Sequence, residues 1–395
     1  MATLGLSKLR TWAAVVAVAI AAAYIYPRAK RIGKVLGIGA TYSSVNTTSC
    51  HIVGQGDLHG CEDIVVDPET GLAYLACGAL KPRQRWLFPD NTYDLSIEAE
   101  ADSIYVMDER DQYSELRVLE HGSDGRLQPF SPSFRVHGFD IYWNPADSND
   151  MTFIFVNHQL GGKAVSIFSH VRGTDFLVHV ETVRSELLIS PNNILALSKR
   201  SFYVTNDMKY ARGLMREVSN SVLRLPNTYV LHRSESGDFR VAAEGIRSAN
   251  GIARYGEWVY VTSCGDPSIH IYRIGQNSSL TLQSRTYYDD SIPDNLFVDP
   301  LSGQIYSTGF LKLLELYKLF KDPSPNTTST AATKIRRLTQ RADPKEGFDI
   351  ETLLVDSGAL MPTATVAAIQ RRNNVQRLLV GCVMCNHLAV CDSVI

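Results

Sequence analysis

The sequence predicts an all-β fold, a six-bladed β-propeller that follows a hydrophobic N-terminal anchor helix. A hairpin pattern recurs along the chain: a short apolar strand, a turn rich in Gly, Pro, Asp or Ser, and a strand centred on Tyr. Its copies span residues 64–75, 194–204, 251–261 and 296–306. Tyr203, Tyr260 and Tyr306 follow one another at steps of about 50 residues, the length of a four-stranded blade. We therefore assign residues 41–395 to the propeller and residues 1–40 to the anchor and its linker.

Short strands at 103–107 and 152–156 fill the interval between the first two copies of the hairpin. The competing interpretation is a pair of β-sandwiches whose hairpins are alike by coincidence. Repetition at blade length favours the propeller.

Composition excludes several classes of protein. The chain has 395 residues, of which 45% are hydrophobic and 20% charged, so it is neither disordered nor fibrous. It carries 39 Lys and Arg against 41 Asp and Glu, a net charge of −2, and so lacks the basic excess that attracts nucleic acids. We expect no nucleic-acid partner, and the sequence carries no signal for an oligomeric state.

The first 31 residues resemble a targeting segment. An uncharged, apolar-rich stretch at 11–26 lies between the basic residues of 7–10 and those of 28–31. A cleaved signal peptide has a core of this length, but a retained membrane anchor also fits, since a span needs roughly 17–25 residues. The second basic cluster favours retention. Either way the chain enters the secretory pathway, as a membrane-anchored protein with a lumenal or extracellular propeller, or as a secreted one.

Sequons and cysteines agree with that route. Three N-glycosylation sequons begin at Asn46, Asn277 and Asn326. In a ring-shaped fold the first and last strands meet, so Cys50 and Cys391 would lock the ring closed.

The other five cysteines are open to two interpretations. Cys61 and Cys77 lie symmetrically about the turn at Glu69, which suggests that they face each other across a hairpin. Alternatively, most of the five are buried small apolar side chains. Cys382-x-x-Cys385 has no second such pair, so a zinc site is not indicated.

Helical pattern is scarce. Residues 310–320 predict one helix, ended by Pro323, that decorates the propeller. Residues 323–333, rich in Pro, Ser and Thr, predict an exposed loop.

Polar residues precede a strand in all four hairpin copies. They are Glu62 and Asp63, Asn192 and Asn193, Asn250, and Asp294 and Asn295. If these strands are the innermost of radial blades, their side chains converge on the central channel. Carboxylate and amide oxygens are the ligands that Ca²⁺ prefers. A single Asn or Asp before a strand is usually a turn residue, but four equivalent positions favour a cation site.

Two histidines, His137 and His158, lie at strand edges of the intervening blade. A lone histidine is usually structural or solvated. Two on neighbouring strands near a cation would act as a pair, in which one removes a proton from water and the other orients it. A cation that polarises a carbonyl beside such a pair makes ester or lactone hydrolysis the natural reaction class.

With these motifs the sequence resembles the serum paraoxonase/arylesterase family of calcium-dependent lactonases, which are six-bladed β-propellers. The resemblance runs from about Cys50 to Cys391. Its most specific motifs are Gly60-Cys61-Glu62-Asp63, Val136-His137-Gly138, Val156-Asn157-His158, Pro191-Asn192-Asn193-Ile194, Ala249-Asn250-Gly251-Ile252, and Asp294-Asn295 followed by Val298-Asp299-Pro300.

The resemblance implies a role for each matching position. His137 would be the water-activating base and His158 its partner. The ligands of a catalytic calcium would be Glu62, Asn192, Asn250, Asp294 and Asn295. Cys50 and Cys391 match the ring-closing bridge of the family, and the apolar N-terminus resembles its retained one.

Two departures from the family limit what carries over. A second, structural calcium would use Asp63, the carbonyl of Phe139 and the position of Asn193, where a carboxylate is expected, so this site would be weak or empty. Residues 82–86 replace the active-site tyrosine region, so the small ester or lactone substrate is not specified further.

Two other functions compete with this one. A non-catalytic, calcium-stabilised binding propeller would have no need of His137 and His158 at the channel. A gluconolactonase-like enzyme would share the metal but not the histidine pair, and a relative of strictosidine synthase would lack most of the metal ligands.

Overall fold

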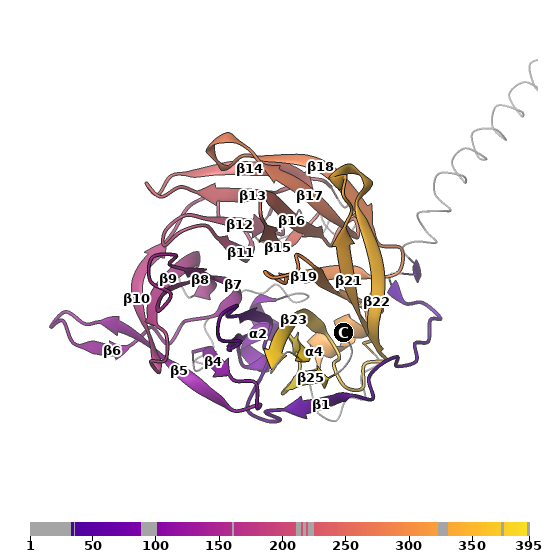
Figure 1. Cartoon of the computed structure of the whole chain (residues 1–395), viewed down its shortest axis with the longest axis horizontal. Coiled ribbons are helices and arrows are strands. Elements are labelled where there is room, and N and C mark those ends of the chain that lie inside the picture. The colour runs from indigo at the N-terminus through magenta and orange to yellow at the C-terminus, as the bar shows by residue number, and fades with distance from the viewer. Residues whose placement is uncertain are drawn as a thin grey trace, which may run out of the picture.

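The computed structural model describes residues 33, 34 and 36–392, with gaps at 88–100, 160–161, 211–214, 216–218, 220–224, 323–330 and 373–374. Six β-sheet blades surround a central axis, and the chain visits them in order (Figure 1). The predicted all-β propeller is therefore confirmed. The N-terminal residues 1–32, on which the predicted anchor falls, lie outside the described residues. Among those described, no helix combines the length and apolar character that a membrane crossing requires.

Each blade has four strands. From the first blade to the sixth, the innermost strands are β2 (Asp63–Val66), β7 (Val136–Trp143), β11 (Pro191–Ala196), β15 (Ala249–Tyr255), β19 (Ile292–Val298) and β23 (Ala364–Arg372). In the same order, the second strands are β3 (Ala73–Cys77), β8 (Asp150–Gln159), β12 (Phe202–Asn206), β16 (Trp258–Ser263), β20 (Ile305–Phe310) and β24 (Val375–Cys382). The third strands are β4 (Ser103–Met107), β9 (Gly162–Val171), β13 (Thr228–Arg233), β17 (Ser268–Ile274), β21 (Thr333–Gln340) and β25 (Leu388–Asp392). The outermost strands are β5 (Tyr113–His121), β10 (Phe176–Val183), β14 (Phe239–Ile246), β18 (Leu280–Tyr287), β22 (Phe348–Asp356) and β1 (Cys50–Val53).

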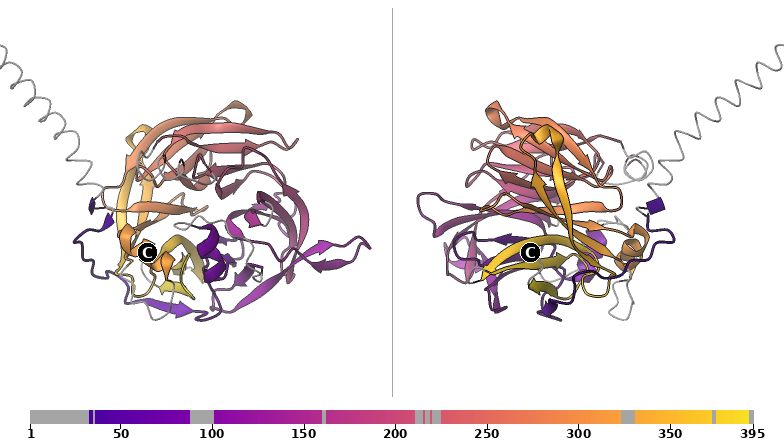
Figure 2. Two further views of the ribbon diagram at one scale, coloured as in Figure 1. Left: turned by 180° about the vertical axis from the view of Figure 1, so that it is seen from behind. Right: turned by 45° about the vertical axis from the view of Figure 1, so that its right-hand side comes forward.

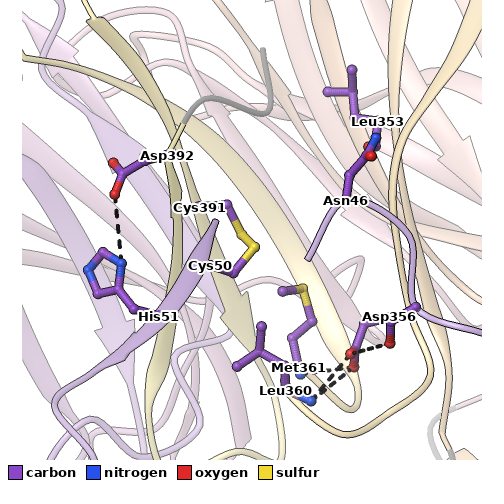
Figure 3. The surroundings of a disulfide bond; sticks show 10 residues. Asn46, Cys50, His51, Leu353, Asp356, Leu360, Met361, Cys391 and Asp392 are labelled. Atoms are coloured by element: carbon purple, nitrogen blue, oxygen red, sulfur yellow. Dashed lines mark hydrogen bonds and ion pairs between the residues drawn. A yellow bond between two sulfur atoms is a disulfide. The ribbon is translucent and has the colours of Figure 1, made fainter. Parts of the chain in front are cut away.

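The ring is closed on the inside and at its seam. Neighbouring inner strands contact one another from β2 round to β23 and back to β2, and the rear view in Figure 2 shows the same closed ring from the opposite face. At the seam, β1 pairs with β25 so that Cys50 stands opposite Cys391. These two residues form a disulfide (Figure 3). The predicted lock is confirmed, and so is the suggested pair Cys61–Cys77, which is also a disulfide.

The tyrosines of the hairpin pattern fill the core between the blades. Tyr74, Tyr203, Tyr260 and Tyr306 lie in second strands, and each is at most 1% exposed. Second strands are covered on both faces by adjacent blades, so nearly all of the residues with assigned burial in β3, β8, β12, β16 and β20 are buried rather than every other one. Burial of a phenol is tolerated because its hydroxyl finds a partner, as Tyr203 does by donating to the carbonyl of Ser278 at 2.8 Å.

The first two blades share one sheet. Outermost strand β5 pairs in parallel with β10, with Arg117 opposite Phe176, and the short strand β6 (Leu127–Pro129) adds to β5. The other four blades are separate four-stranded sheets. The sequence pattern of short hairpins did not predict this outer junction.

Helices also lie beside the strands, together with the short 3-10 turns η2 (Gln276–Ser278) and η3 (Pro344–Glu346). Helix α2 spans Leu80–Trp86, and α4 spans Leu313–Lys321. The predicted helix over 310–320 was placed too early, because Phe310 still belongs to β20. Helix α4 packs its apolar side against Val383 and Met384.

The predicted exposed loop at 323–333 was wrong at its C-terminal end. Ala331, Ala332 and Thr333 are buried, and Thr333 begins β21. The rest of that segment, including Asn326, lies outside the described residues. Of the other sequon asparagines, Asn46 and Asn277 are exposed, and Asn46 also donates to the carbonyl of Leu353 at 2.8 Å (Figure 3). Glycosylation at these positions stays a prediction.

Candidate active site

The polar residues expected at the channel lie in a β-bulge at the start of an inner strand. Relative to the second strand, the register shifts at 136–139 in β7, 191–194 in β11, 249–252 in β15 and 293–296 in β19. A bulge bends a strand and redirects its side chains. The polar residues inside these bulges are His137, Asn192, Asn193, Asn250, Asp294 and Asn295. Glu62 directly precedes β2 and completes the set.

Glycines let the inner strands approach one another at this point. A Cβ on Gly138 would lie 2.6 Å from Cγ of Asn193, and one on Gly251 would lie 2.7 Å from Cα of Asn295. No side chain fits at such distances, so glycine is required by close backbone contact. Each glycine follows a site residue and brings the next blade's polar pair against it.

Hydrogen bonds connect three of the expected site residues across blades. Asn193 Nδ2 donates to Asn295 Oδ1 at 2.8 Å, and Asn295 Nδ2 donates to Glu62 Oε1 at 3.0 Å and to the Glu62 carbonyl at 3.2 Å. Asn295 is fully buried. The two amides thus hold the Glu62 carboxyl group in one orientation from blades three and five.

In addition to the hydrogen-bonded Asn193, Asn295 and Glu62 side chains, the cluster contains buried oxygens that have no hydrogen-bond partner among the described residues. They are Glu62 Oε2, Asn192 Oδ1, Asn250 Oδ1 and Asp207 Oδ1. Asn192 Nδ2 donates to Asp207 Oδ2 at 3.4 Å, and Asn250 hydrogen-bonds to Asp294. Buried acceptors without donors are costly to leave unsatisfied. A bound cation is a partner that oxygens of this kind accept.

Burial disfavours ionisation of the carboxyl groups in this cluster. Burial raises the pKa of Glu62 to about 7, although the charge of Arg83 and the hydrogen bond from Asn295 lower it. The pKa of Asp294 is raised well above its usual value by burial and then by the charges of Glu62 and Asp207. Like charges gathered in a buried site call for a counter-ion.

The chemistry of these donors fits calcium. Within the described part of the chain, no three His, Cys, Asp or Glu side chains form a metal centre by themselves, so amide oxygens would complete the shell. An all-oxygen set of carboxylates and amides suits Ca²⁺ and offers nothing to softer ions.

The expected histidine pair is in contact. Nδ1 of His137 lies 3.2 Å from Nε2 of His158, and Nε2 of His137 lies 3.6 Å from Oε1 of Glu62. Both rings are nearly inaccessible to solvent. Burial lowers the pKa of His137 to about 3, with the charge of Arg83 adding to it, and burial also lowers the pKa of His158 well below its usual value. Both imidazoles are therefore neutral near pH 7.

Of the residues expected at a second cation, the side chains of Asp63 and Asn193 already form hydrogen bonds. Asp63 accepts the backbone N–H of Ile64 at 3.0 Å and that of Phe139 at 3.1 Å. Asn193 Oδ1 accepts from the backbone of Ile194 at 2.6 Å, while its Nδ2 binds Asn295. With an amide in place of a carboxylate, this set fits a hydrogen-bonded scaffold better than a second cation. We derive no chemistry from a second ion.

Sequence reasoning missed two groups at the site. Arg83 of α2 is fully buried, and its Nη2 lies 3.8 Å from Oδ2 of Asp102, which also accepts the backbone N–H of Val136 at 2.9 Å. This pair therefore supports the residue directly before His137. The sequence signal that could have revealed Arg83 is its place between Leu80 and Leu87, two apolar residues spaced as on one face of a helix. Asp207 was the second, and its signal was its place directly after a Tyr-centred strand.

Comparison with known proteins agrees with this geometry. Residues 42–392 match the family described as Arylesterase. The chain is 28% identical over 345 residues to serum paraoxonase/arylesterase 2 of Bos taurus, covering 86% of this chain and 87% of that protein. It is 27% identical over 328 residues to serum paraoxonase/lactonase 3 of Homo sapiens, covering 82% and 84%. A solved structure of a luciferin-regenerating enzyme aligns with a TM-score of 0.52 at 13% identity over 89% of this chain and 96% of that chain, which supports the fold alone.

Proposed function

Because the chain belongs to the arylesterase family and is an ester- and lactone-cleaving hydrolase, we propose that its reaction depends on calcium and on the His137–His158 pair at the channel. The ligands of the calcium would be Glu62, Asn192, Asn250, Asp294 and Asn295. The observation that carries the proposal is the contact between Nε2 of His137 and Glu62, 3.6 Å apart, beside the unpartnered buried oxygens of the described residues.

When bound, calcium would supply a positive charge that polarises the substrate carbonyl and stabilises the oxyanion formed on it. The other steps belong to side chains of this protein. His137 accepts a proton from the attacking water at Nε2, because its Nδ1 is occupied by the contact with His158. His158 fixes the ring and its tautomer from behind.

Glu62 serves both halves of the site. Its Oε1 lies next to His137 Nε2, where a positive charge develops as the proton arrives, and its Oε2 has no partner among the described residues. The hydrogen bonds from Asn295 to Oε1 and to the backbone carbonyl of Glu62 hold the carboxyl group in place during that change. Burial of the site strengthens each of these electrostatic contacts.

We also propose that the protein matures in the secretory pathway. The support is the pair of disulfides, Cys50–Cys391 and Cys61–Cys77, which persist in oxidising compartments. Membrane attachment through residues 1–40 remains a sequence-based proposal.

The calcium requirement is tested with aromatic esters and aliphatic lactones assayed before and after chelation. We expect chelation to abolish hydrolysis and added Ca²⁺ to restore it. Glu62→Gln should weaken calcium binding by at least about 10-fold in titration calorimetry, because it removes one buried charge from the ligand set. Glu257→Gln is the matched control, since Glu257 is exposed and pairs with Arg273.

Hydrolysis at an unchanged rate by the metal-free protein would overturn the proposal. Calcium binding without any ester or lactone turnover would instead favour a binding propeller.

A further inference from the structure

Two cysteines remain together after the two disulfides are accounted for. Of the seven cysteines, three form no disulfide: Cys264, Cys382 and Cys385. Cys382 is the last residue of β24, and Cys385 lies three residues later, in the turn before β25. Both side chains are buried, Cys382 completely and Cys385 to all but 4% of its surface.

The two thiols are in contact. The thiol of Cys382 donates a hydrogen bond to the sulfur of Cys385, and this contact, after burial, helps to raise the pKa of Cys382 well above its usual value. Cys385 Sγ also donates to the carbonyl of Pro362 at 2.9 Å.

The backbone of the turn is held in place on one side. The Val383 N–H donates to the Thr363 carbonyl at 3.2 Å, and the Met384 N–H donates to Thr363 Oγ1 at 3.1 Å. Contacts with Pro362 and Thr363 therefore hold the turn that carries Cys382 and Cys385.

A metal does not explain the pair. The neighbouring His387 contacts the Leu360 carbonyl at 2.7 Å with Nε2 and Asn386 Oδ1 at 3.1 Å with Nδ1. No group of three or more possible His, Cys, Asp or Glu ligands exists in the described parts of the chain. A structural zinc site needs four such donors.

We propose that Cys382 and Cys385 are an oxidation site that closes to a third disulfide by exchange with a protein or low-molecular-weight disulfide. Cys385, the less buried thiol, loses its proton and attacks one sulfur of the external disulfide, which releases one thiol. Cys382 loses its proton and attacks the mixed disulfide at the sulfur of Cys385, and the second external thiol leaves. The two cysteines give up two electrons and two protons in total, and the external disulfide takes them up.

Closure of this bridge would brace the segment that leads to the site. The Gly60 N–H donates to the Cys385 carbonyl at 2.8 Å, and Gly60 stands two residues before Glu62. Gly381, next to Cys382, packs so closely on the Cys61 carbonyl that a Cβ there would lie 2.4 Å from it. Because the closed loop is short, we expect a local effect on this segment rather than a large gain in global stability.

The test incubates the full chain in glutathione buffers of increasing oxidised fraction, both as the native protein and during refolding. After acid quenching and alkylation in denaturant, peptide mass spectrometry reads each cysteine. For the native protein we expect three alkylated cysteines in the reducing limit. In the oxidising limit of either arm we expect the Cys382–Cys385 peptide to be unalkylated and two hydrogen atoms lighter than its dithiol form. The Gly60 amide should exchange more slowly with deuterium in the oxidised protein.

Cys264→Ser is the matched control, since it removes the third thiol and should leave the oxidation of the pair unchanged. The proposal is overturned if Cys382 and Cys385 are still alkylated after both oxidising treatments while Cys50–Cys391 stays closed. Separate glutathione adducts on the two residues would overturn it as well.

Discussion

His137 joins the two halves of the proposed chemistry, with His158 at one ring nitrogen and Glu62 near the other. His137→Gln should lower kcat/KM for an ester or lactone by about 10²–10⁴-fold, because the amide cannot take the proton from water. Calcium binding should persist, since His137 is not among the proposed ligands. Steady-state kinetics and calorimetry on the same preparation measure the two effects.

His179→Gln is the control for His137→Gln. His179 lies in the same blade but on its outermost strand, β10, where it contacts Thr182 Oγ1 at 2.8 Å. Equal activity losses in the two variants would remove His137 from the mechanism.

His270 gives the protein a predictable acid sensitivity. It is buried on β17 next to the hydroxyl of Tyr272, and burial lowers its pKa to about 3, with Arg285 and Arg247 lowering it further. An unfolded histidine titrates near pH 6.5. This contribution to stability is therefore complete above about pH 6.5 and is lost as the pH falls toward 3, because only the unfolded chain takes up the proton there. At pH 5 the expected loss is about 2 kcal/mol.

Urea unfolding of His270→Gln at pH 7 and pH 5 checks this sign. The drop in the free energy of unfolding between the two pH values should shrink by about 2 kcal/mol relative to the parent protein. His121→Gln, at an exposed position, should leave the drop unchanged. If the His270→Gln drop matches the parent's, another group carries the acid sensitivity.

Among single residues, the sequence predicted candidate site residues that recur at equivalent positions of the hairpins. It missed residues whose role depends on contact between distant segments. Asn192, Asn250 and Asp294 precede equivalent strands, so repetition revealed them. Arg83 and Asp102 lie in unrelated segments and meet only when α2 folds against the first blade. A buried ion pair between such segments produces no repeating pattern in the sequence.

The bulged inner strands are the elements that assemble the site, and glycine sets how closely they approach. Gly138→Ala should destabilise the protein by about 1–3 kcal/mol and weaken calcium binding, because its Cβ would lie 2.6 Å from Asn193 Cγ and 2.7 Å from the Asn192 carbonyl. Denaturant unfolding and calcium titration measure the two effects.

Gly122→Ala is the control for Gly138→Ala. A Cβ there would meet only side-chain atoms of Gln128 and Asp124, at 3.0 Å and 3.1 Å, which can move aside. A destabilisation as large as that of Gly138→Ala would mean that close strand contact is not the cause.

Among the elements, the hairpins were predictable and the bulges were not. Turn residues and the central Tyr mark where a strand starts and reverses. A register shift depends on how the strand pairs with its neighbour, and a polar residue before a strand looks the same with or without it. The sequence therefore indicated equivalent positions in successive hairpins, while the structure shows that the strand register shifts at those positions.

At the scale of the whole molecule, the seam between the ends of the ring is the point to test. Replacing Cys50 and Cys391 together by Ser should lower the free energy of unfolding by about 2–5 kcal/mol, because their disulfide closes a loop with a sequence separation of 341. The Cys61→Ser, Cys77→Ser variant should lose less, since its loop has a separation of only 16. Denaturant unfolding under non-reducing conditions compares them.

If the Cys61–Cys77 variant proves as unstable as the Cys50–Cys391 variant, closure of the ring is not what the longer bridge contributes. The Cys50–Cys391 bridge was predictable from the sequence, because a ring must join its first and last strands. The β5–β10 junction was not predictable, because the outermost strands of two blades share no sequence pattern.

The β5–β10 junction joins two of the six blades into one sheet. Glu62 directly precedes the first strand of the first blade, the imidazoles of His137 and His158 belong to the second, and these two blades are hydrogen-bonded to each other along their outer edge. Asn192, Asn250 and Asp294 come from three sheets with no such seam. We therefore expect Glu62, His137 and His158 to keep their mutual spacing when the blades move, and blade movements to change the spacing of the proposed calcium ligands Asn192, Asn250 and Asp294 instead.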